Sequence, residues 1–299
     1  MTGSPDRAGG VIRLATRGSA LALAQTALAA ARLTACGAPG TETVVIRTSG
    51  DRSAAPAAEM EGAGWFTAEL EAALLGGRAD AAVHSAKDLP TALAAGAGAV
   101  IAIVDRADPR DALVLRGGER LDGLPAGAAV GTSSLRREAF LRELRPDLRA
   151  VPIRGNVDTR IRKLDAGEVD GLLLAAAGLD RLGLGARATL RLDAATFVPA
   201  PAQGAIAVES AGVDERVDGL LAAADDALAH ACVRAERAVL EALGGGCRLP
   251  LGAWARIEDG EIAIVAALAA AGGVRRVESR GDQAAPERLG RAVAEALRP

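Results

Sequence analysis

Short apolar runs alternate with longer alanine- and leucine-rich stretches along the first 104 residues. Such alternation is typical of strands followed by helices. A strand is predicted at 11–16, and a helix from Ala20 to Leu33 follows, with Ser19 suited to its N-cap. Further predicted elements are strands at 43–48, 79–85 and 100–104, and a helix at 66–75. This order predicts an α/β domain.

The same strand–helix order starts again after the segment 106–111, with strands predicted at 128–132, 149–153 and 170–175. A lone strand at 203–209 predicts that the chain crosses back to complete the first sheet. A long helix at 218–243, strands at 252–257, 261–269 and 274–281, and a closing helix at 284–297 indicate a small α+β domain. The expected domains are 1–104 with 199–217, then 105–198, then 218–299.

Two stretches break the periodicity. Residues 50–64 are rich in Ala, Gly, Pro and acidic residues, and a loop of this length is more often a lid or binding loop than a plain connection. Three glycines and Pro250 place Cys247 on a turn between structured segments. Arg248 beside it favours a thiolate, although a glycine-rich helix end that merely contains a cysteine explains the pattern equally well.

Composition removes several classes of function. The net charge of −3 argues against non-specific binding of nucleic acid. Three cysteines without a pairing pattern, and no leader in residues 1–10, favour a reducing cytoplasm. No apolar run approaches the ~18 residues of a membrane span. The two histidines lie far apart in sequence and lack spaced cysteines, which argues against a metal site.

Cations recur where predicted strands end or helices begin. Arg136 and Arg137 fall in the first turn of a predicted helix, where the helix dipole disfavours them unless an anion binds there. Lys87, one of only two lysines, stands beside Asp88 at a strand end, although a simple turn pair is the alternative. The full set is Arg17, Lys87, Arg136, Arg137, Arg154, Arg160 and Arg181. We predict a binding site for a small polyanion.

The chain resembles the porphobilinogen deaminase (hydroxymethylbilane synthase) family along nearly its whole length. The matching segments are LATRGSALALAQ (14–25), ADAAVHSAKDLP (79–90), DPRDALV (108–114), VGTSSLRREAFL (130–141), RGNVDTR (154–160), LAAAGLDRLGL (174–184), PAQGAIAVE (201–209) and AERAVLEALGGGCRLPLGA (235–253). The resemblance implies two type-II periplasmic-binding-protein-like α/β domains with a central cleft, plus a small α+β C-terminal domain.

The resemblance also implies a transferase of tetrapyrrole biosynthesis that joins four porphobilinogen units head to tail and releases hydroxymethylbilane. Its dipyrromethane cofactor would be a covalent thioether on Cys247. Asp88 would be the catalytic carboxylate, a buried group that stabilises the cation left when ammonia departs. Expected cofactor-binding residues are Ser85, Lys87, Asp88, Thr132, Ser133, Ser134, Arg136, Arg137, Gly155 and Asn156. Expected substrate-binding residues are Arg17, Ser19, Phe66, Arg154, Arg160, Arg181 and Gln203.

Members of the family often carry lysines where this chain has Ala63 and Ala68. The contribution of the lid to carboxylate binding is therefore in doubt. A monomer that binds no metal, nucleic acid or membrane is expected. Two rival hypotheses stay open. A binding protein for a small polyanion would need no exposed cysteine and would usually carry an export signal. A cysteine-nucleophile hydrolase would need a base beside Cys247.

Overall fold

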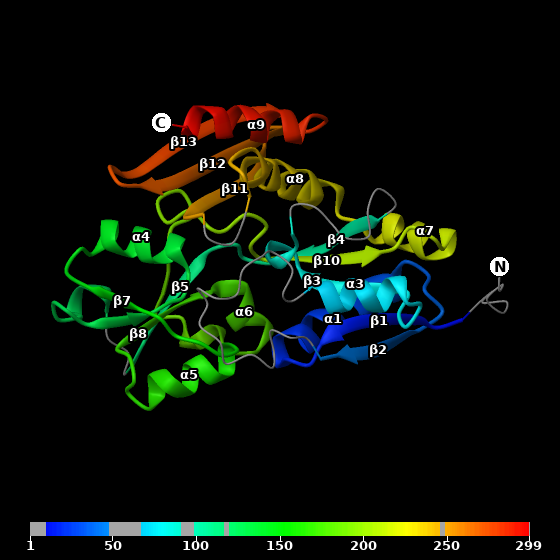
Figure 1. Cartoon of the computed structure of the whole chain (residues 1–299), viewed down its shortest axis with the longest axis horizontal. Helices are drawn as coiled ribbons and strands as arrows, with labels where there is room; N and C mark the ends of the chain where they lie inside the picture. Colours follow the sequence, from blue (N-terminus) through cyan, green and yellow to red (C-terminus); the bar gives the residue numbers. More distant parts are fainter. Residues whose placement is uncertain (1–9, 48–66, 91–98, 117–119, 246–248, 299) are drawn as a thin grey trace. The chain divides into compact units, whose positions relative to one another are not determined.

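A computed structural model describes residues 10–47, 67–90, 99–116, 120–245 and 249–298. Contacts divide the chain into two compact units. The described residues up to Asp105 join Ile206–Asp226 in unit 1. Residues Arg106–Ala205 join the described residues from Ala227 onward in unit 2 (Figure 1). The described residues form three separate sheets.

Unit 1 is built on a five-stranded sheet in the order β2-β1-β3-β10-β4. Its strands are β1 (Ile12–Arg17), β2 (Thr41–Ile46), β3 (Ala81–Ser85), β4 (Val100–Arg106) and β10 (Ala205–Ser210). Its helices are α1 (Ala20–Ala35), α3 (Ala68–Leu75) and α7 (Glu215–Ala224), and a 3-10 turn, η1 (Ala86–Asp88), follows β3. Strand β10 runs antiparallel to β3, which confirms the prediction that the returning chain completes the first sheet.

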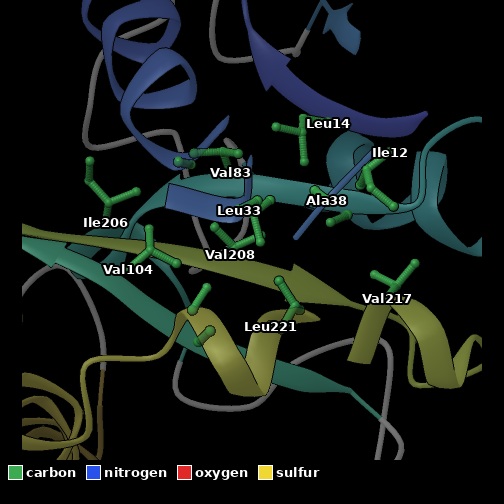
Figure 2. Packing of buried hydrophobic residues seen from close by; sticks show 14 residues of the cluster. Ile12, Leu14, Leu33, Ala38, Val83, Val104, Ile206, Val208, Val217 and Leu221 are labelled. Carbon is green, nitrogen blue, oxygen red and sulfur yellow. The ribbon is translucent and has the colours of Figure 1, made fainter. Parts of the chain in front are cut away.

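Helices cover both faces of this sheet. On one face, Leu33 of α1 and Leu221 of α7 pack against Leu14, Val83 and Val208 of the strands (Figure 2). On the other face, α3 contributes its own buried leucines to a second cluster. The near-continuous apolar strands follow from burial on two sides. Because both faces are covered, polar chemistry is left to the ends of the strands.

Unit 2 contains a second five-stranded sheet in the order β7-β6-β8-β5-β9. Its strands are β5 (Asp111–Leu115), β6 (Ala129–Gly131), β7 (Arg149–Val151), β8 (Gly171–Ala175) and β9 (Leu190–Arg191). Its helices are α4 (Leu135–Leu144), α5 (Val157–Asp165) and α6 (Ala176–Arg181), with 3-10 turns η4 (Leu121–Gly123) and η5 (Gly185–Arg187). Here β5 runs antiparallel beside β8, as β10 does beside β3.

The rest of unit 2 is an antiparallel sheet of β11 (Leu251–Glu258), β12 (Glu261–Ala270) and β13 (Gly273–Asp282). Helices α8 (Ala227–Ala242) and α9 (Pro286–Leu297) lie together on one face of it (Figure 1). Alternate residues of β12 therefore face different cores. Ile264 packs with these helices, whereas Val265 joins Phe140 and Phe197. The predicted fold class, two mixed α/β domains with a small α+β domain, is confirmed.

The predicted helix at 218–243 is wrong, because the chain forms α7 and α8 with a break at Asp225 and Asp226. The Asp225 carboxylate accepts a hydrogen bond of 2.7 Å from the backbone N–H of Ile103. The N–H of Asp226 donates to the Ile103 carbonyl at 2.8 Å. These bonds to a strand edge replace helical ones, which is how aspartate competes with a helix. Strands β5 and β9 were not predicted, and the domain boundaries stay a prediction.

Candidate functional site

In unit 1, two predicted site residues end neighbouring strands. Arg17 is the last residue of β1 and Ser85 the last of β3, and the two strands run parallel, so their carboxyl ends meet at one edge. Ser19 is confirmed as the N-cap of α1, accepting a hydrogen bond of 3.2 Å from the Ala22 N–H. This edge is where open α/β sheets bind their ligands.

The buried Gln25 of α1 fixes the end of β3. Its amide both donates to and accepts from the Ser85 hydroxyl, at 3.0 and 3.1 Å. Lys87 and Asp88 follow on the η1 turn, and both side chains are exposed. The expectation of a buried carboxylate at Asp88 is therefore wrong for the chain alone, because the turn carries Asp88 beyond the covered part of the strand. An exposed carboxylate at this position is accessible to a ligand.

In unit 2, the hydroxyls predicted to bind cofactor also organise the start of α4. Ser134 is the N-cap of α4 and accepts a hydrogen bond from the Arg137 N–H at 3.4 Å. The Ser133 hydroxyl donates to the Ile153 carbonyl at 2.7 Å and so ties the residues after β6 to those after β7. Thr132 is buried and accepts from the Ser134 N–H at 3.2 Å. Local capping explains these residue types without a ligand.

Arg136 and Arg137 lie in the first turn of α4 as predicted, but both are buried against Asp111, the first residue of β5. The Arg136 Nη1 is 2.6 Å from one carboxylate oxygen, and the Arg137 Nη2 is 2.7 Å from the other. We predicted a bound anion from these two arginines, and the carboxylate of Asp111 already neutralises part of their positive charge. Burial raises the pKa of Asp111, but the charges of both arginines outweigh burial and hold the pKa well below its usual range.

Arg160 of α5 is a different kind of cation. Its Nε donates to the Gly155 carbonyl at 2.8 Å, and among the described residues no carboxylate pairs with it. Burial and, to a smaller extent, the nearby positive charge of Arg137 together lower the pKa of Arg160 to about 10. Gly155 has φ of +110° and precedes Asn156 at the start of α5. Arg154, half-buried after β7, lies just before this turn.

Arg181, the last residue of α6, bonds to the segment before β10, and Gln203 lies in that segment. The Arg181 Nη2 donates to the Gly204 carbonyl at 2.6 Å. Gln203 is 1% exposed and donates through Nε2 to the Pro109 carbonyl at 2.8 Å and to Asp111 at 3.0 Å. Gln203, predicted only as a substrate-binding residue, thus belongs to the buried Asp111 cluster. This cluster is defined as Asp111, Arg136, Arg137 and Gln203.

Several predicted residues lie outside the described ones, namely Cys247, Arg248, Phe66 and the predicted lid at 50–64. Cys232 is buried in the core between α8, α9 and their sheet. In the part of the chain that the structure describes, no group of three or more His, Cys, Asp or Glu side chains could hold a metal ion. Nor does any described helix reach the length and apolarity that crossing a bilayer requires.

Two contributors were missed by the sequence analysis, Asp111 and Gln25. Each is a polar residue next to an apolar run, in DPRDALV and LATRGSALALAQ. A buried polar side chain needs a hydrogen-bond partner. A polar residue beside an apolar run was therefore the available signal, but the sequence did not show which residue would be its partner.

Comparisons with known proteins agree with these motifs. Residues 12–219 match the model described as porphobilinogen deaminase, dipyromethane cofactor binding domain, and residues 230–299 match its C-terminal domain. A porphobilinogen deaminase of Xanthomonas campestris pv. campestris is 48% identical over 294 residues, covering 96% of this chain and 95% of the relative. One from Xanthomonas euvesicatoria is 47% identical over 291 residues, with the same coverage.

Among solved structures, a periplasmic substrate-binding protein of an ABC transporter from Coxiella burnetii aligns with a TM-score of 0.43 and 16% identity. That alignment covers 72% of this chain and 91% of the other. The family models together span both units, and the curated relatives match over almost their full length. The chain therefore belongs to the porphobilinogen deaminase family.

Proposed function

We propose that this chain deaminates porphobilinogen and joins four units head to tail on a dipyrromethane cofactor, releasing hydroxymethylbilane and ammonia. Family membership supports this reaction, and the cofactor is the one named for the domain that residues 12–219 match. The structural observation that supports this reaction is the excess of positive charge around Arg137. Two arginines share the single carboxylate of Asp111, and Arg160 has no carboxylate partner among the described residues.

The residues suit a ligand with carboxylates. Each pyrrole unit carries an acetate and a propionate, so growth of the chain adds two negative charges per ring. Guanidinium groups bind carboxylates through paired hydrogen bonds. We infer that Arg136, Arg137 and Arg160 hold cofactor and substrate carboxylates together with Arg17, Lys87, Arg154 and Arg181. The Ser85 and Thr132–Ser134 hydroxyls and the Gly155–Asn156 turn would complete the cofactor contacts, and Ser19, Phe66 and Gln203 the substrate contacts.

Asp88 has the chemistry that loss of ammonia requires. We infer that its carboxylate faces the positive charge that develops on the substrate, and that it accepts and returns protons at its oxygens. Its position on a short turn directly after β3 gives it a fixed base and an accessible carboxylate. When bound, the cofactor supplies the pyrrole to which the first substrate unit is joined. We infer that Cys247 holds it as a thioether.

Intact mass of the purified chain and of its Cys247→Ser variant tests the attachment. A mass excess equal to a dipyrromethane is expected in the parent and absent in the variant. The full excess in the variant would move the attachment away from Cys247. A parent that gains no adduct after incubation with porphobilinogen, and releases no ammonia, would contradict the proposed reaction.

The Asp88→Asn variant tests the catalytic carboxylate separately. The exposed position of Asp88 predicts an unchanged melting temperature, because no buried interaction is lost. Ammonia release should fall by about 10²-fold or more, the usual range for a general acid–base group. Turnover close to that of the parent would remove Asp88 from this role. We further propose that the protein acts as a monomer in the cytoplasm, without nucleic acid or membrane; a dimer in sedimentation would contradict the first point.

A further inference from the structure

We infer that Asp111 is a positioning residue for the cofactor: it assembles Arg136 and Arg137 in advance and leaves one of their two charges for a ligand carboxylate. This inference rests on the proposed function, because the ligand is taken to be the carboxylate-bearing cofactor. The Asp111 side chain is completely buried and pairs with Arg136 and Arg137, so it would act through the two arginines. None of the expected cofactor contacts included it.

The geometry fixes both guanidinium groups from several elements. Asp111 is completely buried, and its Oδ2 accepts from the Arg136 Nη1 while its Oδ1 accepts from the Arg137 Nε at 2.9 Å. Arg136 also donates to the Val198 carbonyl at 2.7 Å, and Arg137 to the Leu173 carbonyl at 3.0 Å. Gln203 holds Asp111 itself at 3.0 Å. Such a supported arrangement keeps side chains in one orientation before a ligand arrives.

The charges of this cluster do not balance. Two guanidinium groups meet one carboxylate, and Arg160, the neighbour that Arg137 repels, adds a further positive charge without a carboxylate among the described residues. Placement in the first turn of α4 adds repulsion from the helix dipole. A cluster that served stability alone would gain from a second acid or from one arginine fewer. The surplus is therefore explained by an anion that comes from outside the chain.

A second aspartate in the same segment shows what a balanced cluster looks like. Asp108 pairs with Arg110 and Arg191, at 2.8 and 2.6 Å. Arg191 also pairs with Asp180 at 2.6 Å, so two acids meet two arginines. None of these four residues is an expected site residue. Asp108 is therefore the matched control for Asp111, with the same residue type and the same number of arginine partners.

The test compares Asp111→Asn, Asp111→Glu and Asp108→Asn with the parent, all as the full chain. Four quantities are measured: the fraction carrying the dipyrromethane mass, the KM for porphobilinogen, the kcat per loaded molecule, and the melting temperature. Asp111→Glu keeps the charge, so the arginines stay paired and the variant folds, but one extra methylene moves both guanidinium groups. It decides the question if Asp111→Asn does not fold.

We expect both Asp111 variants that fold to show a lowered cofactor fraction and a KM raised about tenfold, which corresponds to about 1.4 kcal/mol. Their kcat per loaded molecule should stay within about threefold of the parent, because Asp111 does not contact the reacting atoms. Asp108→Asn should keep the cofactor fraction and KM of the parent. A structural role alone would lower the melting temperature and the amount of active protein without moving KM.

Parental cofactor fraction and KM in Asp111→Glu would overturn the inference, and so would losses that merely follow the melting temperature and appear equally in Asp108→Asn. Either result leaves the proposed function intact as long as the parent carries the adduct and turns over. Failure of the parent itself to gain the adduct or release ammonia would instead contradict the proposed function.

Discussion

Asp108 and Asp111 lie three residues apart and each pairs with two arginines, yet they do different things for the molecule. The Asp111 side chain is completely buried, whereas that of Asp108 keeps 18% of its surface exposed. Asp108 belongs to a partly exposed group in which two acids meet two arginines. Asp111 is the only acid of the buried Asp111 cluster. Two aspartates with the same number of arginine partners therefore need not contribute equally to stability.

Solvent accounts for the difference. Water screens the ion pairs of Asp108 and can replace them, so their contribution to stability is small. Asp111 is completely buried, and the loss of its carboxylate would leave two buried guanidinium groups without a compensating charge. Four predictions test this comparison, in order of expected effect.

The largest effect is expected from removing the buried charge. Asp111→Asn should lower the free energy of unfolding by about 3–5 kcal/mol, because it leaves uncompensated buried cations. Asp108→Asn should lower it by about 1 kcal/mol or less. Urea unfolding followed by circular dichroism gives both values under one set of conditions. Equal losses in the two variants would show that burial does not separate them.

Gly204 adjoins both aspartates, since it follows Gln203 of the Asp111 cluster and its carbonyl accepts from the N–H of Ala107 at 3.1 Å. Its φ is +88°, and an added Cβ would lie 2.4 Å from the Ala107 carbonyl oxygen. Gly204→Ala should cost about 2–4 kcal/mol, a left-handed conformation plus a clash. Gly127→Ala, with φ of +80° and nothing within 4 Å, carries only the conformational part.

Thermal unfolding compares the melting temperatures of Gly204→Ala and its control Gly127→Ala. The melting temperature should fall clearly further for Gly204→Ala. Similar shifts would mean that the Ala107 backbone moves aside without cost, and that the segment carrying Asp108 and Asp111 is less firmly held than the distances indicate.

Arg160 extends the comparison from stability to binding. Because burial and Arg137 both disfavour its charge, Arg160→Gln should leave stability within about 0.5 kcal/mol of the parent or raise it slightly. KM for porphobilinogen should rise about tenfold, since a charged hydrogen bond to a ligand carboxylate is lost. The exposed neighbour Arg162, paired with Asp158, provides the control variant Arg162→Gln. A parental KM in Arg160→Gln would contradict its assignment.

The smallest effect is a dependence on pH. Burial raises the pKa of Asp108, but hydrogen bonds from Arg110 and Arg191 outweigh burial and lower the pKa to about 2, against about 3.9 in an unfolded chain. A lowered pKa stabilises the fold above the unfolded value, and that stabilisation is lost as the pH falls through the folded value. It should amount to about 1 kcal/mol after screening.

The gap in melting temperature between the parent and Asp108→Asn should therefore close as the pH falls from about 4 to 2. The pKa of Asp111 is lowered further still, so part of the gap for Asp111→Asn should persist at pH 2. A gap for Asp108→Asn that does not change over this range would show that its ion pairs add no stability to the folded chain.

Much of the architecture could be predicted because local patterns and global structure agree. Ser19 was predicted as a helix cap and caps α1, and the strand after residue 203 does complete the first sheet. The prediction failed where a side chain bonds to a distant segment. The predicted helix is interrupted at Asp225 because the Asp225 carboxylate accepts a hydrogen bond from the edge strand β4. The spacing of apolar residues carries no information about such a bond.

By itself the sequence determined the family, most of the strands and helices, and the positions of cations at strand ends, since all of these are local patterns or ordered motifs. Only the tertiary structure decided which cations are neutralised within the chain. Arg136, Arg137 and Arg160 look alike in sequence, but β5 brings a carboxylate to the first two and none of the described residues brings one to the third. The physical reason is that charge compensation depends on distance and burial, and both are set by which strands pair.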